Sequence, residues 1–166
     1  PRTVELADAV LTTDPSAVVN DPNVDLVGEV IGGIEPARSL ILEAIANGKS
    51  VVTANKAVIA RHGPEIASAA RAAGVYVLIE AAVGGGIPII EPLKQSLGGN
   101  RINRVSGIIN GTTNYILTRM ANEGAAYADV LAEAQRLGYA EADPAADGDG
   151  LEAADTIAIM PARAFG

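Results

Sequence analysis

One lysine stands where a parallel sheet would offer it to a ligand. Lys56 follows directly after the apolar run at residues 50–53. Open parallel sheets bind their ligands at the carboxyl ends of their strands. A lysine at that edge could hold a cofactor phosphate or a substrate carboxylate, or transfer a proton if it is desolvated. The alternative interpretation is a solvent-exposed lysine at the start of a helix.

A carboxylate and a glycine-rich loop form the second candidate. Glu80 precedes three consecutive glycines at positions 84–86. Glycine lets the backbone turn its carbonyl groups toward a ligand, and a carboxylate with such carbonyls could bind a hard cation. The alternative is a hinge between two domains, which needs only the flexibility of the glycines. The loop is not a nucleotide-binding P-loop, because no Gly-Lys-Ser/Thr follows it.

Two further segments carry polar groups that suit a small charged ligand. Residues 110–114 read Asn-Gly-Thr-Thr-Asn and lie between an expected strand and an expected helix. A helix N-terminus there could bind a carboxylate or phosphate, although an ordinary threonine cap explains the same residues. Six carboxylates fall between Glu141 and Asp155. No frame of this segment supplies an EF-hand ligand set, so it is either a solvated loop or a cluster that recognises a substrate amino group.

Composition excludes several classes of function. The chain of 166 residues has a net charge of −8 and no basic patch, so we expect neither nucleic acid nor a membrane as a partner. No apolar run approaches the roughly 20 residues that span a bilayer. The absence of cysteine excludes thiol catalysis and fits a cytoplasmic protein. The only histidine, His62, lies beside Gly63 and Pro64 and is expected at the surface.

Alternating strands and helices are expected to position the first two candidates. A Gly32-Gly33 turn follows the first strand, and Gly48 and Gly74 end the helices. Strand, helix and strand at this spacing imply a parallel sheet, which would make residues 1–82 part of a Rossmann-type domain without its G-x-G-x-x-G turn. The expected strands cover residues 24–31, 50–53 and 75–80, and the expected helices cover residues 37–47 and 65–73.

The second half of the chain, residues 83–166, is expected to be mostly helical. Its one expected strand, residues 104–109, leads directly into the Asn-Gly-Thr-Thr-Asn segment. Helices around few strands indicate an α+β domain. The predicted fold class is therefore α/β, with a partial Rossmann-type parallel sheet followed by an α+β domain. Helices are expected at residues 88–97, 113–121 and 127–137 and from Leu151 onward.

Four segments form a specific combined pattern. They are Val-Val-Thr-Ala-Asn-Lys at 51–56, Glu-Ala-Ala-Val-Gly-Gly-Gly-Ile-Pro-Ile-Ile at 80–90, Asn-Gly-Thr-Thr-Asn-Tyr-Ile-Leu at 110–117 and Gly-Tyr-Ala-Glu-Ala-Asp-Pro at 138–144. Asp-Gly-Asp-Gly-Leu-Glu-Ala-Ala at 147–154 continues the pattern. Together, in this order, these segments resemble homoserine dehydrogenase, and the resemblance covers almost the whole chain.

This resemblance implies an enzyme that uses NADP or NAD to interconvert L-aspartate 4-semialdehyde and L-homoserine. That reaction belongs to the biosynthesis of threonine, methionine and isoleucine. The resemblance also implies that residues 1–82 are a remnant of the NAD(P)-binding domain, and that residues 83–166 are part of a substrate-binding and dimerisation domain in a homodimer. The chain would then be a central portion of such an enzyme.

The same resemblance implies roles for individual residues. Gly32 and Gly33 would lie near the cofactor, and Lys56 would contact cofactor and substrate and is a candidate for proton transfer. Glu80 and the backbone carbonyls of Val83, Gly85 and Ile87 match a monovalent-cation site for Na⁺ or K⁺. The implied substrate-binding residues are Thr112, Glu141, Asp147 and Glu152, whose carboxylates would receive the substrate ammonium.

One departure from the family signature concerns the implied catalytic pair. In the family a lysine lies four residues after an aspartate on the last helix and donates the proton, whereas this chain has Glu152 and Thr156. A threonine hydroxyl cannot supply a cationic proton at neutral pH, and general acid help is worth on the order of 10²–10⁴ in rate. Pro161 in the same helix is expected to kink it. The alternative function is therefore a catalytically inactive homologue that binds an amino acid or dimerises.

Overall fold

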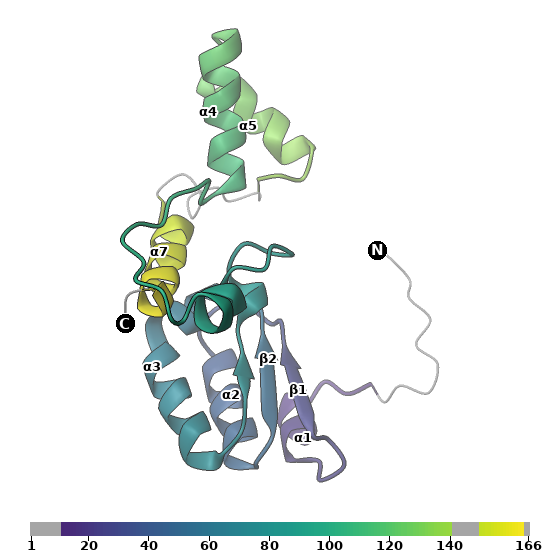
Figure 1. The fold of residues 1–166 in the computed structure, drawn as a ribbon. Helices are drawn as coiled ribbons and strands as arrows, with labels where there is room; N and C mark the ends of the chain where they lie inside the picture. The colour runs from purple at the N-terminus through teal and green to yellow at the C-terminus, as the bar shows by residue number, and fades with distance from the viewer. Residues whose placement is uncertain (1–10, 141–149, 165–166) are drawn as a thin grey trace.

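A three-stranded parallel sheet organises the first half of the chain in the computed structural model, which describes residues 11–140 and 150–164. The strand order is β1-β2-β3, and helices lie against the sheet (Figure 1). The fold class predicted from the sequence is therefore confirmed. The elements are α1 (Pro15–Asn20), β1 (Leu26–Glu29), α2 (Ala37–Ala46), β2 (Ser50–Thr53), α3 (Lys56–Ala73) and β3 (Val77–Leu78).

The register of the sheet brings the carboxyl ends of two strands together. In the parallel pair β1 and β2, Leu26 is opposite Ser50 and Glu29 is opposite Thr53. Strand β3 continues the sheet with Val77 opposite Val51. Because Glu29 and Thr53 are the last residues of their strands, their side chains meet at the edge where parallel sheets bind ligands.

The core lies between the sheet and the helices α2 and α3. Ile41 and Ile45 of α2 are nearly inaccessible, as are Val51 of β2 and Ile66 of α3. Burying each side chain of this size contributes about 1.5–3 kcal/mol. The predicted apolar face of α2 is confirmed, since Leu40, Ile41, Ala44 and Ile45 are all buried. Gly48 and Gly74 have φ values of 72° and 68°, the left-handed conformation expected after a helix.

The start of α3 differs from the prediction. The sequence pair Gly63-Pro64 indicates a helix that begins at Glu65, but α3 begins at Lys56 and passes through Pro64. Asn55 caps the helix, and Val58 and Ile59 in its first turns are buried. Burial of this face and the cap outweigh the local cost of a proline inside the helix.

Two of the three strands are also shorter than predicted. Strand β1 covers four of the residues expected to be extended, and β3 covers only Val77–Leu78. Glu80 belongs to a short 3₁₀ helix, η1 (Glu80–Ala82), instead of the third strand. The reason lies in its side chain, which binds the amide groups of a following helical turn, as described below.

The second half of the described chain consists of helices and connecting segments. Its elements are the π-helical turn η2 (Pro92–Ser96) and the helices α4 (Gly111–Glu123), α5 (Tyr127–Arg136) and α7 (Leu151–Ala164). Helices α4 and α5 form a hairpin that extends away from the sheet, and α7 lies beside α3 (Figure 1). The helix α7 continues past Pro161. None of the described helices is long and apolar enough to cross a membrane.

The strand predicted at residues 104–109 is not formed. Within the described residues this segment pairs with no strand, and Ile108 is 73% exposed. A run such as Val-Ser-Gly-Ile-Ile indicates extended backbone, but a strand also needs a neighbour for its N–H and C=O groups. The helix predicted at residues 113–121 is confirmed as α4, whereas the one predicted at residues 88–97 is shorter and includes the π-helical turn η2.

Candidate functional site

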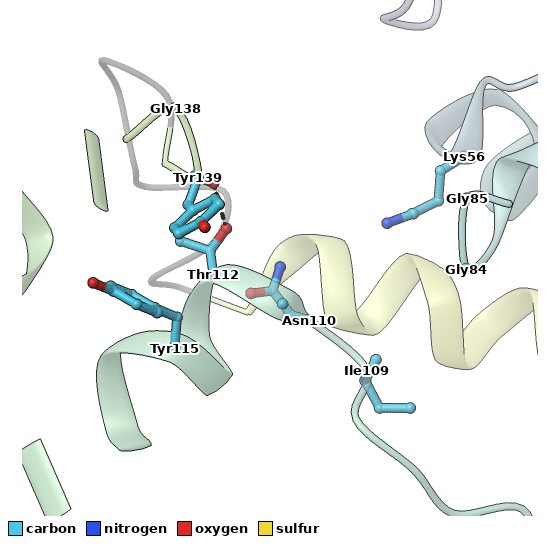
Figure 2. A pocket seen from close by; sticks show the side chains of 10 residues that line it. Lys56, Gly84, Gly85, Ile109, Asn110, Thr112, Tyr115, Gly138 and Tyr139 are labelled. Atoms are coloured by element: carbon cyan, nitrogen blue, oxygen red, sulfur yellow. Dashed lines mark hydrogen bonds between the residues drawn. The ribbon is translucent and has the colours of Figure 1, made fainter. Parts of the chain in front are cut away.

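A cavity of about 680 Å³ lies between the carboxyl edge of the sheet and the start of the α4–α5 hairpin. Lys56 approaches it from the sheet side, and Thr112 and Tyr139 face it from the hairpin side (Figure 2). The cavity therefore brings together two candidates, Lys56 and Thr112, that lie far apart in the sequence. Its lining consists of Lys56, Gly84, Gly85, Ile109, Asn110, Gly111, Thr112, Tyr115, Gly138 and Tyr139.

The first residue of α3 carries the lysine of this cavity. Lys56 is half-buried, and its side chain extends past the loop of Gly84 and Gly85 toward Asn110 (Figure 2). Its direction is set by Asn55, whose side-chain oxygen accepts a hydrogen bond from the N–H of Val58 at 3.2 Å. Lys56 therefore starts a helix and also lines a cavity, and its contact with a ligand stays a prediction.

The start of α4 forms the opposite wall. The side chain of Asn110 accepts a hydrogen bond from the N–H of Thr113 at 2.7 Å and so caps this helix. Gly111 and Thr112, in the first turn, line the cavity. The N-terminal end of a helix carries partial positive charge, and Lys56 adds a full charge across the cavity. This electrostatic arrangement suits a carboxylate or a phosphate.

Thr112 and the aromatic residues around it link the start of α4 to the segment after α5 at this wall of the cavity. The hydroxyl of Thr112 donates to the backbone carbonyl of Tyr139 at 2.7 Å. The rings of Tyr115 and Tyr139 meet edge to face, with centroids 5.2 Å apart. Nη1 of Arg119 on α4 forms an ion pair with Oε2 of Glu133 on α5 at 3.0 Å. The Thr112 hydroxyl therefore has a protein acceptor at this wall of the cavity (Figure 2).

A buried polar cluster lies behind Lys56, and the sequence patterns did not identify it. Glu29 is 4% exposed, and its Oε2 accepts a hydrogen bond from the hydroxyl of Thr53 at 2.6 Å. The side-chain amide of Asn55 donates to the carbonyl of Gly33 at 2.8 Å. The available signal was an acidic residue inside an apolar strand, at the edge where parallel sheets bind ligands.

The Gly32-Gly33 turn is formed as predicted. The two glycines have φ values of 81° and 69°, a conformation that favours glycine over residues with a Cβ. They follow β1 and lie outside the lining of the Lys56 cavity. The carbonyl of Gly33, however, accepts a hydrogen bond from the side chain of Asn55, which precedes Lys56. The turn and the lysine therefore belong to one connected edge of the sheet.

Glu80 accepts three backbone hydrogen bonds. Its Oε1 accepts from the N–H groups of Ile89 and Ile90 at 2.5 and 2.9 Å, and its Oε2 accepts from Glu91 at 2.7 Å. Burial raises the pKa of this carboxyl, but the three amide groups outweigh burial and hold the pKa below its ordinary value. Glu80 therefore anchors the segment that follows the glycine loop.

The hydrogen bonds that the Glu80 carboxylate already accepts limit which cation it could bind. Oε1 receives two amide hydrogens, whereas Oε2 receives one and keeps a second lone pair. No group of three or more His, Cys, Asp or Glu side chains suited to a metal occurs among the described residues. One carboxylate with backbone carbonyls suits a hard monovalent ion better than a transition metal.

Thr156 lies in a different cavity from Lys56. It is 4% exposed and lines an apolar space of about 240 Å³ together with Val83, Ile87 and Met160. The two cavities share Gly84 and Ile109 in their linings and are therefore neighbours. Glu141 and Asp147 lie outside the described residues, as does the side chain of Glu152 on α7, so the predicted rim of carboxylates lies outside them too.

His62 belongs to a cluster of charges on α2 and α3. Its Nδ1 is 3.4 Å from Oε2 of Glu65, and its side chain is 31% exposed. Arg38 on α2 binds the same carboxylate at 2.5 Å. These hydrogen bonds and charges raise the pKa of Arg38 and lower that of Glu65. His62 does not line the Lys56 cavity.

Two family models match this chain and together cover most of it. Residues 1–80 match the model described as homoserine dehydrogenase, NAD binding domain. Residues 88–166 match the model described as homoserine dehydrogenase. The two matches occur in the order expected from the resemblance noted in the sequence.

Individual relatives agree with these models. A homoserine dehydrogenase from Synechocystis is 68% identical over all 166 residues, which span 38% of that protein. The crystal structure of a homoserine dehydrogenase from Thiobacillus denitrificans matches with a TM-score of 0.90 and 59% identity, covering 93% of this chain and 36% of that one. A hyperthermophilic archaeal homoserine dehydrogenase in complex with NADPH matches with a TM-score of 0.87 and 32% identity, covering 97% and 50%.

The chain thus spans less than two fifths of the length of its Synechocystis relative, but the similarity is continuous along it. Sequence, family models and solved structures agree over both halves. The resemblance predicted from the four sequence segments is confirmed. This chain belongs to the homoserine dehydrogenase family.

Proposed function

We propose that this protein is an NAD(P)-dependent homoserine dehydrogenase, which interconverts L-aspartate 4-semialdehyde and L-homoserine. The observation that carries the proposal is the cavity in which Lys56 faces the start of α4 at the carboxyl edge of a parallel sheet. The chain that forms this cavity is 68% identical over its whole length to a protein named homoserine dehydrogenase.

The nicotinamide, when bound, supplies hydride transfer, and the protein supplies orientation and charge. Gly32 and Gly33, which follow β1 in left-handed conformation, would border the cofactor. Lys56 would hold the substrate beside it. The N–H groups at the start of α4 would bind the substrate carboxylate. The hydroxyl of Thr112 donates its hydrogen to Tyr139, so its oxygen would accept a hydrogen bond from the substrate ammonium. The carboxylates proposed for the substrate ammonium are Glu141, Asp147 and Glu152.

Proton transfer to the aldehyde oxygen needs an acid, and we assign it to Lys56. Thr156 can donate a hydrogen bond but cannot act as a cationic acid at neutral pH. It also lines the neighbouring apolar cavity instead of the one that contains Lys56. In this protein Nζ of Lys56 therefore donates the proton, while Glu152 contributes to the binding of the substrate.

Several broader assignments accompany this proposal. Residues 1–82 would form part of the NAD(P)-binding domain, and residues 83–166 would form part of the substrate-binding and dimerisation domain of a homodimer. The protein would act in the cytoplasm, in the biosynthesis of threonine, methionine and isoleucine. The cofactor would be NADP or NAD, and the archaeal relative in complex with NADPH favours the phosphorylated form.

A monovalent cation, Na⁺ or K⁺, is the final component of the proposal. Oε2 of Glu80 and the carbonyls of Val83, Gly85 and Ile87 would hold it and so stiffen the loop beside Lys56. The thermal unfolding midpoint should then be higher in NaCl or KCl than in choline chloride at equal ionic strength. Equal midpoints in the three salts would refute the cation site. They would not bear on the proposed reaction.

The reaction is tested by following the production of NADPH or NADH from homoserine. Lys56→Ala should lower kcat by about 10²–10⁴ if this lysine transfers the proton. Lys94→Ala is the matched control, because Lys94 is exposed and lies outside the cavity. The proposal fails if the folded native protein turns over homoserine with neither cofactor.

A further inference from the structure

A buried carboxylate behind the site has no role in the reaction as proposed. Glu29 ends β1, and besides Thr53 its Oε1 accepts from the N–H of Ile31 at 2.8 Å and more weakly from the amide of Asn55 at 3.4 Å. In the described part of the chain no Lys, Arg or His forms an ion pair with Glu29. Burying a carboxylate without a cation is costly, so its hydrogen bonds must offset that cost.

The partners of Glu29 come from three separate segments. Ile31 belongs to the turn after β1, Thr53 is the last residue of β2, and Asn55 precedes α3. The backbone adds a further link, because the N–H of Ala54 donates to the carbonyl of Glu29 at 3.2 Å. One side chain therefore sets the relative positions of a turn, a strand end and a helix start.

Asn55 extends these contacts toward the cavity. Its amide group donates both to Glu29 and to the carbonyl of Gly33, and its side-chain oxygen caps α3. Its own N–H donates to Oγ1 of Thr53 at 2.9 Å. Lys56 is the next residue and the first of α3, so the geometry of this cap determines the direction in which its side chain projects.

We propose that Glu29 is a positioning residue, which acts through Thr53 and Asn55 to fix the Gly33 turn and Lys56 in one geometry. The inference rests on the proposed function of Lys56 and adds a group that touches neither substrate nor cofactor. A displacement of about 1 Å in a group that orients a substrate can cost about 10² in rate. On this proposal, the buried carboxylate keeps the Gly33 turn and Lys56 in fixed positions relative to each other.

The substitution Glu29→Gln tests this inference without changing the shape of the side chain. If the new amide nitrogen faces Thr53, the hydroxyl must accept two hydrogen bonds and its own hydrogen loses the buried acceptor. If the nitrogen faces Ile31 instead, two N–H groups oppose each other. Either orientation breaks one hydrogen bond of the cluster.

Kinetics and unfolding should separate positioning from a merely structural role. We expect Glu29→Gln and Thr53→Val to lower kcat for homoserine about 10²-fold, with a much smaller change in KM. Thr53→Ser keeps the hydroxyl and should restore kcat to within about threefold of the native protein. The inference is overturned if Glu29→Gln lowers the melting temperature but leaves kcat unchanged.

A second measurement does not depend on turnover. Lysine amino groups labelled by reductive ¹³C-methylation give separate NMR signals, and Lys56→Arg identifies the signal of Lys56. Glu29→Gln should shift that signal and leave the signal of Lys94, which is 55% exposed on η2, unchanged. An unshifted Lys56 signal also overturns the inference. A native protein that lacks homoserine turnover refutes the proposed function, while the NMR signal still decides the role of Glu29.

Discussion

The hydroxyl of Thr112 at the start of α4 donates to the backbone carbonyl of Tyr139, just beyond the end of α5, at 2.7 Å. The bond closes the helical hairpin at the wall of the cavity that faces Lys56 (Figure 2). A residue predicted as a substrate contact therefore also has a structural partner. The two roles make different demands on the hydroxyl, and substitution separates them.

Thr112→Val should raise KM for homoserine by a factor of about 10 to 150, because a lost hydrogen bond to a charged ligand group costs about 1.5–3 kcal/mol. Its effect on the unfolding free energy should stay near 1 kcal/mol, since Tyr139 is exposed and water can replace the lost hydrogen bond. Steady-state kinetics and urea unfolding measure the two effects. Thr112→Ser is the control and should stay near the native values. A KM for Thr112→Val equal to that of the native protein would contradict the substrate contact.

Glu80 should make the stability of the protein depend on pH in the acidic range. Its three amide hydrogen bonds lower its pKa in the folded state. A carboxyl with a lowered folded pKa stabilises the protein fully above its unfolded pKa of about 4.3 and loses this effect as pH falls through the folded value. Glu80→Gln should therefore lower the unfolding free energy by about 1–2 kcal/mol at neutral pH and by less below pH of about 4.

Urea unfolding at several pH values measures this difference. Glu91→Gln is the matched control, because the Glu91 side chain pairs with Lys94 at 3.6 Å near the surface. Exposed substitutions of this kind change the unfolding free energy by about 0.5 kcal/mol or less. A Glu80→Gln effect that stays constant from neutral pH to acid would contradict the assignment of charge to Glu80.

Gly74 should be needed for its backbone conformation alone. Its φ is 68°, and a Cβ there would meet no heavy atom within 4 Å. Gly74→Ala should therefore destabilise the protein by about 1–2 kcal/mol through strain in the left-handed region, without any clash. Gly74→Asn should cost less, because asparagine tolerates this conformation. Equal losses for alanine and asparagine in thermal unfolding would show that strain is not the cause.

Local sequence patterns predicted those parts of the fold that depend on near neighbours. Strand β2 lies at residues 50–53 as expected, and the apolar face of α2 is buried as its spacing indicated. The patterns failed where distant contacts decide the outcome. The predicted start of α3 at Glu65 followed the local signals of Gly63 and Pro64, whereas Val58 and Ile59 are buried against the rest of the core.

The candidate site was predicted in the same uneven way. Lys56, Gly85 and Thr112 were each identified from motifs, and the structure brings them to one cavity. Glu29 was missed because its partners Thr53 and Asn55 lie 24 and 26 residues away. A carboxylate within an apolar run can still face solvent, and the contacts between the ends of β1 and β2 show that this one is buried.

Thr156→Lys should increase the homoserine dehydrogenase activity of this protein. Thr156 lines an apolar space of about 240 Å³ that adjoins the Lys56 cavity at Gly84 and Ile109. The stem of a lysine can lie against Val83 and Met160, with its amino group directed toward the shared wall. A second acid near the substrate should raise kcat by about 10²–10⁴ if proton transfer limits the native rate.

The same substitution should reduce stability, because an apolar cavity disfavours an ammonium group and lowers the pKa of a buried lysine. Thr156→Met is the matched control, since it fills a similar volume without a charge. In the reduction of L-aspartate 4-semialdehyde, activity should rise with lysine and not with methionine. The gain in this direction should increase at lower pH, where more of the introduced amine carries the proton that it donates. Equal activity of the two folded variants would mean that a lysine at position 156 does not reach the reacting oxygen.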